Sequence, residues 1–201
     1  MFQSNINIKT GGKGEYFYLD YYIPKNKKNA IDKGKLTPIV TYSDLILKYK
    51  KGESKAIAFF IKILNNIIYN YFYFYDLMLP VPPSNSYLDV YPNSQLCMYL
   101  SALGTISTYE KAVVCTKGHK PGHIENNIEL KKMDYHNISF DSKYDYKMKK
   151  IIILDDIITT GTTFKLIKNG LLKEGASAVT GIFLGKTLTE EDIVNFAGGD
   201  I

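Results

Sequence analysis

The stretch that most constrains the fold is Ile151–Leu172, where an apolar run leads through two aspartates and a threonine-rich turn into an amphipathic segment. The run Ile151–Leu154 predicts a buried strand, and apolar residues recur at helical spacing from Phe164 to Leu172. A strand that passes directly into a helix is the building unit of α/β folds. The stretch therefore favours a sheet covered by helices.

The chain from residue 76 onward repeats this alternation. Short apolar runs predict further strands at Asp76–Val81, Ala112–Cys115 and Ala178–Leu184, and Leu96–Leu103 has the spacing of a helix. Residues 116–149 are mostly polar and are predicted to form a long loop or a small hairpin. Strands that alternate with helices predict a mostly parallel sheet flanked by helices.

The N-terminal part is harder to interpret. It predicts a strand at Glu15–Ile23, a loop at Pro24–Lys35, and a short helix that Ser43 caps and that runs to Lys50. A second helix follows Ser54, with one apolar face made of Ile57, Phe60, Ile61, Leu64 and Ile68. We expect the aromatic residues of the first strand to pack in a core rather than to stack on a ligand. Near the other end, Thr189 and Asp192 predict a capped last helix.

Composition narrows the class of protein. The 201 residues suit one domain, and all 25 basic residues are lysines, which give a net charge of +5. Lysine is a point charge without the planar fork of arginine, so a small polyanion suits this chain better than sequence-specific DNA. The two cysteines, Cys97 and Cys115, form neither a zinc ribbon nor a disulfide scaffold by their spacing, and we expect free thiols. The polar N-terminus and the lack of a long apolar stretch predict a cytoplasmic protein without a membrane span.

The turn after the buried strand carries the chemistry. Asp155 and Asp156 are placed where the strand ends, and two carboxylates suit a pair of sugar hydroxyls or indirect contact with a metal ion. Thr159, Thr160, Gly161, Thr162 and Thr163 then lead into a helix, whose first amides can bind a phosphate. The alternative is that the aspartates and threonines merely favour the start of a helix. The whole arrangement predicts a cradle for a ribose phosphate.

At Ile151–Thr163 the sequence resembles the signature of type I phosphoribosyltransferases, which bind 5-phosphoribosyl 1-pyrophosphate (PRPP). The resemblance implies that Asp155 and Asp156 bind the ribose hydroxyls, that residues 159–163 bind the 5′-phosphate, and that Mg²⁺ sits on the pyrophosphate without a direct protein ligand. Thr159 stands where the 6-oxopurine transferases carry an aspartate base, which argues against hypoxanthine or guanine as the substrate.

A weaker resemblance links residues 40–187 to the ComF-like branch of that superfamily. It rests on Leu77–Leu103, with Pro-Val-Pro followed by Asn-x-Gln, and on the Lys-Tyr pair of Ser43–Lys51. The zinc ribbon and the arginines typical of ComF proteins are missing. The resemblance places the pyrophosphate loop at Pro82, Pro83, Ser84, Asn85 and Ser86, for which a plain turn is the alternative. Thr116–His123 resembles the Lys/His-rich loop of orotate phosphoribosyltransferase, which implies a catalytic loop with Lys117 and Lys120. The alternative is a solvated surface loop.

The expected protein is therefore a type I phosphoribosyltransferase-like α/β protein. Residues 1–40 would be a variable segment that could serve as the hood, and residues 41–201 the core. Its expected partners are PRPP, pyrophosphate and a nitrogen nucleophile that the sequence does not identify, with Mg²⁺ as cofactor and a homodimer left open. The alternative is a ComF-like accessory protein in DNA uptake or nucleotide sensing, the only case in which nucleic acid is a partner.

Overall fold

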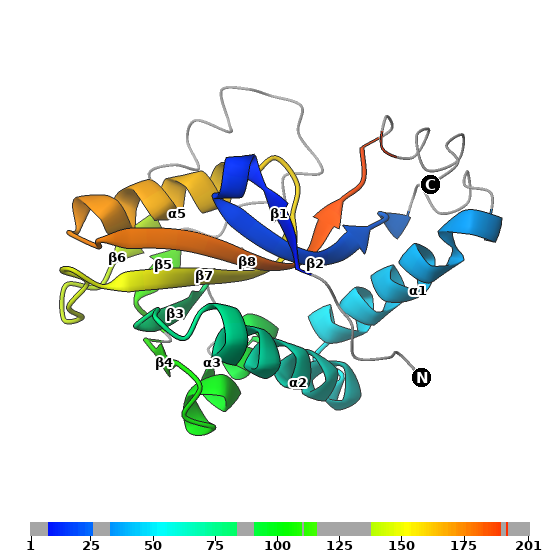
Figure 1. Cartoon of the computed structure of the whole chain (residues 1–201). Helices are drawn as coiled ribbons and strands as arrows, with labels where there is room; N and C mark the ends of the chain where they lie inside the picture. The colour runs from blue at the N-terminus through cyan, green and yellow to red at the C-terminus, as the bar shows by residue number, and fades with distance from the viewer. Residues whose placement is uncertain are drawn as a thin grey trace.

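The computed structural model describes residues 8–25, 33–83, 91–109, 111–115, 138–189 and 192. Its centre is a six-stranded sheet in the order β1-β2-β8-β7-β3-β4 (Figure 1). Only the pair β1–β2 is antiparallel, and the other strands of this sheet pair in parallel. The strands are β1 (Lys9–Gly11), β2 (Tyr16–Tyr22), β3 (Leu77–Pro80), β4 (Ser107–Thr108), β7 (Lys150–Ile158) and β8 (Ala178–Thr187).

Helices cover both faces of the sheet. Figure 1 shows α5 (Thr162–Lys173) on one face, and α1 (Lys33–Lys50), α2 (Ser54–Tyr71) and α3 (Pro92–Ala102) on the other. A single-turn helix, η1 (Gly12–Gly14), joins β1 to β2. None of the described helices is long and apolar enough to cross a membrane. The predicted fold class, a mostly parallel sheet flanked by helices, is confirmed.

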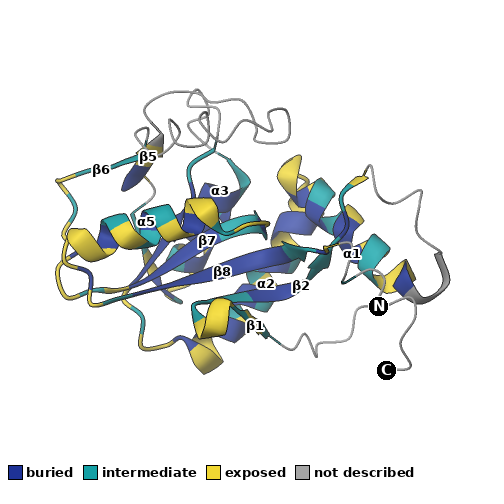
Figure 2. Ribbon diagram, turned by 90° about the horizontal axis from the view of Figure 1, so that it is seen from above, coloured by how far each residue is buried: buried dark blue, intermediate teal, exposed yellow. Residues whose placement is uncertain are grey.

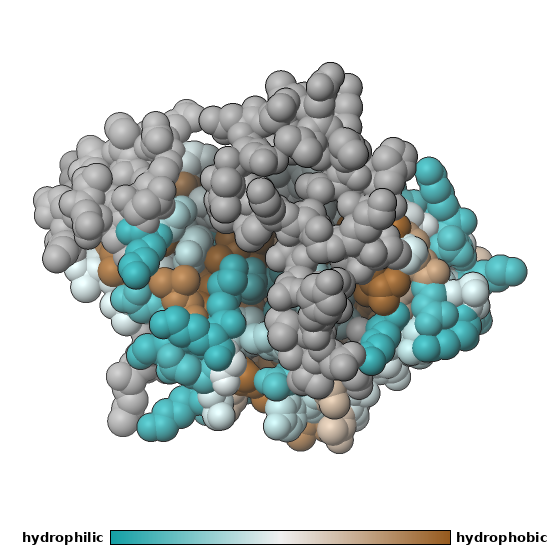
Figure 3. All heavy atoms as spheres, turned by 180° about the vertical axis from the view of Figure 1, so that it is seen from behind, coloured by the Kyte–Doolittle hydropathy of each residue, from teal (hydrophilic) through white to brown (hydrophobic). Residues whose placement is uncertain are grey.

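Each face of the sheet has its own core. In β7, Ile152 and Leu154 belong to the cluster beneath α1–α3, while Ile151 and Ile153 belong to the cluster beneath α5. A central parallel strand that is buried on both faces has the continuous apolar sequence seen here. Figure 2 shows β7 and β8 largely buried, with the exposed residues of α5 on its outer side. Seen from behind, the described surface mixes hydrophilic residues with small hydrophobic patches (Figure 3).

Helix α1 begins at Lys33, well before the predicted start at Ser43. Ser43 lies inside this helix, where its buried Oγ accepts a hydrogen bond from the amide of Ile23 at 2.9 Å. The predicted cap is therefore wrong, and so is the loop prediction for residues 33–35. Pro38 lies within the helix and removes one helical hydrogen bond. Tertiary packing, with Leu36 buried in a small cluster, offsets that loss.

Two further predictions are wrong, because a local sequence pattern does not show which elements a segment will pack against or pair with. Leu103 follows the end of α3 and is exposed, although its spacing matches the buried face. The strand at Ala112–Cys115 is found as β5 (Val113–Cys115), but it pairs with β6 (Ile138–Phe140) in a separate antiparallel sheet. The main sheet takes β4 in its place.

The predicted capping pair near the end of the chain is confirmed. Thr189 N and Oγ1 donate to Asp192 Oδ2 at 2.9 and 2.8 Å, and Asp192 N donates back to Thr189 Oγ1 at 3.0 Å. Cys97 is a buried thiol outside any disulfide of the described residues, as expected.

Candidate functional site

The two aspartates lie inside β7, whereas the sequence predicted them just after a strand that ends at Leu154. Pairing between β7 and β3 stops at Leu154, where the amide of Val81 donates to its carbonyl at 2.9 Å. Pairing with β8 continues to Ile158. Asp155 and Asp156 are therefore held by β8 on one side, while β3 has already ended on the other.

This position is a topological switch point of the sheet. The chain leaves β3 through α3 to β4, and it leaves β7 through α5 to β8, so the two connections run to opposite sides and opposite faces. In open parallel sheets, ligands bind in the crevice outside the carboxyl ends of the two strands at such a point. The aspartates and the end of β3 lie at this edge of the sheet.

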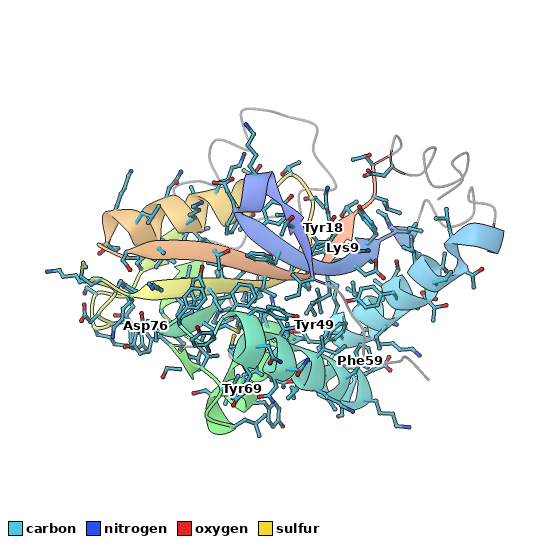
Figure 4. All side chains as sticks on the ribbon, in the orientation of Figure 1. Lys9, Tyr18, Tyr49, Phe59, Tyr69 and Asp76 are labelled. Carbon is cyan, nitrogen blue, oxygen red and sulfur yellow. The ribbon has the colours of Figure 1, made fainter. Side chains whose placement is uncertain are left out.

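Asp155 is held by a buried relay from two helices. The hydroxyl of Tyr49 in α1 donates to Asn93 Oδ1 at 2.8 Å, and Asn93 Nδ2, at the start of α3, donates to Asp155 Oδ1 at 3.1 Å. The amide of Asp156 donates to the same oxygen at 2.8 Å. Tyr49 lies in the core between the sheet and the helices (Figure 4). The relay fixes one carboxylate oxygen of Asp155.

The surroundings of Asp155 disfavour its charge. Burial of the carboxyl group, and then repulsion from Asp156, raise the pKa of Asp155 to about 8. The hydrogen bonds from Asp156 N and Asn93 and the charge of Lys50 act in the opposite direction without cancelling this. A carboxylate that costs free energy in the empty protein is typical of a ligand site.

Asp156 has a different partner. Lys50, the last residue of α1, lies with its Nζ 3.3 Å from Asp156 Oδ2. A cation at a helix C-terminus is also favoured by the helix dipole. Lys50 thus places one positive charge beside the two carboxylates.

The turn after β7 forms the start of α5 as predicted. Gly161 has φ 74° and ψ 10°, a left-handed conformation that favours glycine. The first helical hydrogen bond runs from Lys165 N to Gly161 O at 2.9 Å, so the amides of Thr162, Thr163 and Phe164 precede it. Thr159, Thr160, Thr162 and Thr163 are exposed. The amide of Thr162 donates to Thr160 Oγ1 at 3.4 Å. The amides of Thr163 and Phe164, together with the exposed hydroxyls at this helix start, suit a phosphate.

The predicted pyrophosphate loop is anchored beside the aspartates at both ends. Val81 is bound to Leu154 before it, and Asn93 is bound to Asp155 after it. Pro82 and Pro83 are half-buried there. Ser84, Asn85 and Ser86 lie outside the described residues, as do Lys117, Lys120 and the rest of Thr116–His123.

The sequence analysis did not select Tyr49, Lys50 or Asn93 as site residues. They lie in the two segments that carry the ComF-like resemblance, the Lys-Tyr pair and the Asn-x-Gln opening of a helix. The structure brings both segments to the aspartates. The aromatic residues of β2 behave as expected for packing: Tyr18 is buried, and Tyr16 packs edge-on against Phe164 and Phe183.

No family model and no curated protein matches the chain. Similar solved structures include a hypoxanthine phosphoribosyltransferase from Trypanosoma cruzi, 11% identical with a TM-score of 0.39, where the match covers 72% of this chain and 68% of that one. A purine phosphoribosyltransferase from Pyrococcus horikoshii is 18% identical with a TM-score of 0.41, and the match covers 65% of this chain and 83% of that one. A phosphoribosylpyrophosphate synthetase from Mycobacterium smegmatis is 19% identical with a TM-score of 0.40, and the match covers 66% of this chain and 35% of that one.

Proposed function

We propose that this chain binds PRPP at the switch point and transfers its phosphoribosyl group to a nitrogen nucleophile, with release of pyrophosphate. The observation that carries the proposal is the continuous path from two aspartates in β7, through the Gly161 turn, to the first amides of α5. It supports a ligand with a diol at one end and a phosphate at the other.

In this proposal each group has a separate task. Asp155 and Asp156 accept hydrogen bonds from the ribose hydroxyls, and residues 159–163 bind the 5′-phosphate through amides and hydroxyls. The bond between the anomeric carbon and pyrophosphate breaks, a bond from nitrogen to that carbon forms, and the nucleophile loses a proton. Such a reaction depends on positioning and electrostatics more than on a covalent catalyst.

Mg²⁺ fits this site indirectly. It takes oxygen ligands and keeps several waters, and the carboxylates of Asp155 and Asp156 can accept hydrogen bonds from such waters. Bound to pyrophosphate, the ion would neutralise charge on the leaving group. Residues 82–86 would bind the same group through their amides and hydroxyls, and Lys117 and Lys120 would stabilise its charge as it leaves.

The test is the double variant Asp155→Asn, Asp156→Asn, titrated with PRPP and Mg²⁺ by calorimetry. A hydrogen bond to a charged acceptor contributes roughly 1.5–3 kcal/mol, so losing even one of them should weaken binding at least about tenfold. Asn keeps the shape of Asp, and we expect the melting temperature to be maintained or raised. Asp141→Asn with Asp145→Asn, near the amino end of β7, is the matched control. Equal PRPP affinity in parent and variant contradicts the proposal.

Pyrophosphate release with a panel of bases separates the enzyme from the accessory protein. Pyrophosphate release with one base supports transfer. The rate of release should fall in the variant Lys117→Ala, Lys120→Ala, while PRPP binding is largely kept. PRPP binding without release from any base favours the ComF-like alternative.

A further inference from the structure

A cavity of about 760 Å³ lies at the other end of the sheet. Its lining comes from the amino ends of the strands: Glu15 precedes β2, Tyr75 lies before β3, and Val179 and Thr180 open β8. Asp155 and Asp156 lie toward the carboxyl end of β7, which is parallel to β8 (Figure 1). The cavity is therefore separate from the proposed PRPP site. Its volume is in the range of small-molecule sites.

Five aromatic residues line the cavity: Phe17, Tyr71, Phe72, Phe74 and Tyr75. Phe17 and Phe72 pack edge-on with centroids 4.9 Å apart, and Phe74 and Tyr75 lie 5.0 Å apart. Phe72 is buried, but Tyr71 is 62% exposed and Phe74 is 49% exposed. Core packing explains the buried rings. The exposed ring of Phe74 also contacts Tyr73, with centroids 5.5 Å apart, and lies 5.2 Å from Lys150 Nζ, whereas packing does not explain the exposed ring of Tyr71. Exposed rings that gather at a cavity offer faces for a planar ligand.

Charged groups line the same cavity. Lys168 of α5 binds Glu15 with Nζ 2.8 Å from Oε1, so these two charges largely satisfy each other. Lys13, in η1, is exposed and adds a further positive charge. The lining thus combines two lysines with one glutamate, and this excess of positive charge favours an anionic ligand.

The backbone of Lys13 is unusual. Its φ of 57° and ψ of 37° place a non-glycine residue in the left-handed region, between Gly12 and Gly14, which also have positive φ. A residue with a side chain is disfavoured there, and such conformations gather at ligand-binding loops. A glycine would relieve the strain, so the lysine side chain at this position is not explained by the fold.

From these observations we propose that the cavity is a second ligand site, which takes a planar aromatic ring bearing a single anionic group. The ring lies against Tyr71 and Phe74, and Lys13 binds the anion. Nucleotides and aromatic carboxylates share this chemistry. The inference does not depend on the function of the Asp155 site.

The probes are AMP and 2-naphthoate, each titrated into the full chain by calorimetry. Tyr71→Ala removes an exposed ring, and Lys13→Gly removes the charge while relieving backbone strain, so neither should unfold the protein. We expect each variant to weaken binding about fivefold or more, as for the loss of one stacking partner or charge contact. Tyr69→Ala is the matched control, because Tyr69 is 75% exposed on the side of α2 away from the sheet (Figure 4) and outside the cavity.

The outcomes separate the two sites. Binding that Tyr71→Ala and Lys13→Gly weaken, and that Tyr69→Ala and the Asp155→Asn, Asp156→Asn variant do not, supports the cavity site. Tighter binding of AMP identifies nucleotides as the ligand class of the cavity, and tighter binding of 2-naphthoate identifies aromatic carboxylates. The proposal is overturned if neither probe binds at millimolar concentration, if Tyr69→Ala weakens binding equally, or if the aspartate variant alone abolishes it.

Discussion

At the scale of single residues, the carboxylate of Asp155 depends on a donor whose orientation is set elsewhere. An amide side chain offers a donor at one end and an acceptor at the other. Because the Tyr49 hydroxyl donates to Asn93 Oδ1, Asn93 Nδ2 is the end that faces Asp155. Without that hydroxyl, no hydrogen bond from Tyr49 holds the side-chain amide of Asn93 in this orientation. Tyr49 is therefore a positioning residue for the proposed diol site.

Tyr49→Phe tests this relay. A buried acceptor left without its donor costs about 1–3 kcal/mol of stability, and PRPP binding should weaken with it. Tyr42→Phe is the matched control, since the buried Tyr42 hydroxyl donates to Leu184 O at 2.8 Å away from the aspartates. Urea unfolding should show a similar loss in both variants, whereas calorimetry with PRPP should detect weaker binding only in Tyr49→Phe. Equal PRPP affinity in the two variants contradicts the positioning role.

At the scale of elements, the start of α5 depends on the turn that precedes it. Gly161 allows the chain to leave β7 and expose the first amides of the helix. A Cβ there would lie 3.5 Å from Ile158 Cδ1, an ordinary contact, so the cost of a side chain comes from the backbone conformation. For a non-glycine residue that cost is about 1–2 kcal/mol.

Gly161→Ala should lower the free energy of unfolding by about 1–2 kcal/mol and should weaken PRPP binding, because relief of the strain moves the amides. Gly104→Ala provides the comparison: Gly104 has φ 71° and open space around it, in the turn after α3. Urea unfolding should give similar losses for both. Retained PRPP affinity in Gly161→Ala would mean that the turn does not bind the phosphate.

At the scale of the whole molecule, the sequence predicted what is local. The strand, turn and helix from Ile151 to Leu172 are contiguous, so periodicity and turn chemistry were enough to predict them. The strand was ended too early because aspartate is rare in strands, while pairing with β8 carries β7 through both aspartates. Asn93 and Tyr49 reach Asp155 only because the order of strands places α1 and α3 over one face of the sheet. The order of the strands in the sheet cannot be predicted from the sequence pattern of any single segment.

The charge balance of the whole molecule leads to a prediction about pH. Glu15 has a lowered pKa through its hydrogen bond and ion pair with Lys168, and Asp192 through its hydrogen bonds with Thr189. Their stabilisation is present above their usual pKa values and is lost as the pH falls through the lowered ones. Asp155 acts in the opposite direction: its pKa is raised to about 8, so the folded state binds more protons than the unfolded state between about pH 4 and pH 8. The free energy of unfolding should therefore fall as the pH rises across that window.

Asp155→Asn removes the titrating carboxyl group and keeps the shape of the side chain. The free energy of unfolding should then fall less steeply as the pH rises. We expect the variant to be more stable than the parent at about pH 8.5 by at least about 1.4 kcal/mol, the equivalent of one pKa unit, and to gain less at about pH 5.5. Urea unfolding at a series of pH values measures both slopes. Asp145→Asn, an exposed change away from the site, is the control and should follow the parent. Parallel slopes for Asp155→Asn and the parent would mean that the carboxyl group of Asp155 titrates alike in the folded and unfolded chains, and that burial does not disfavour its charge.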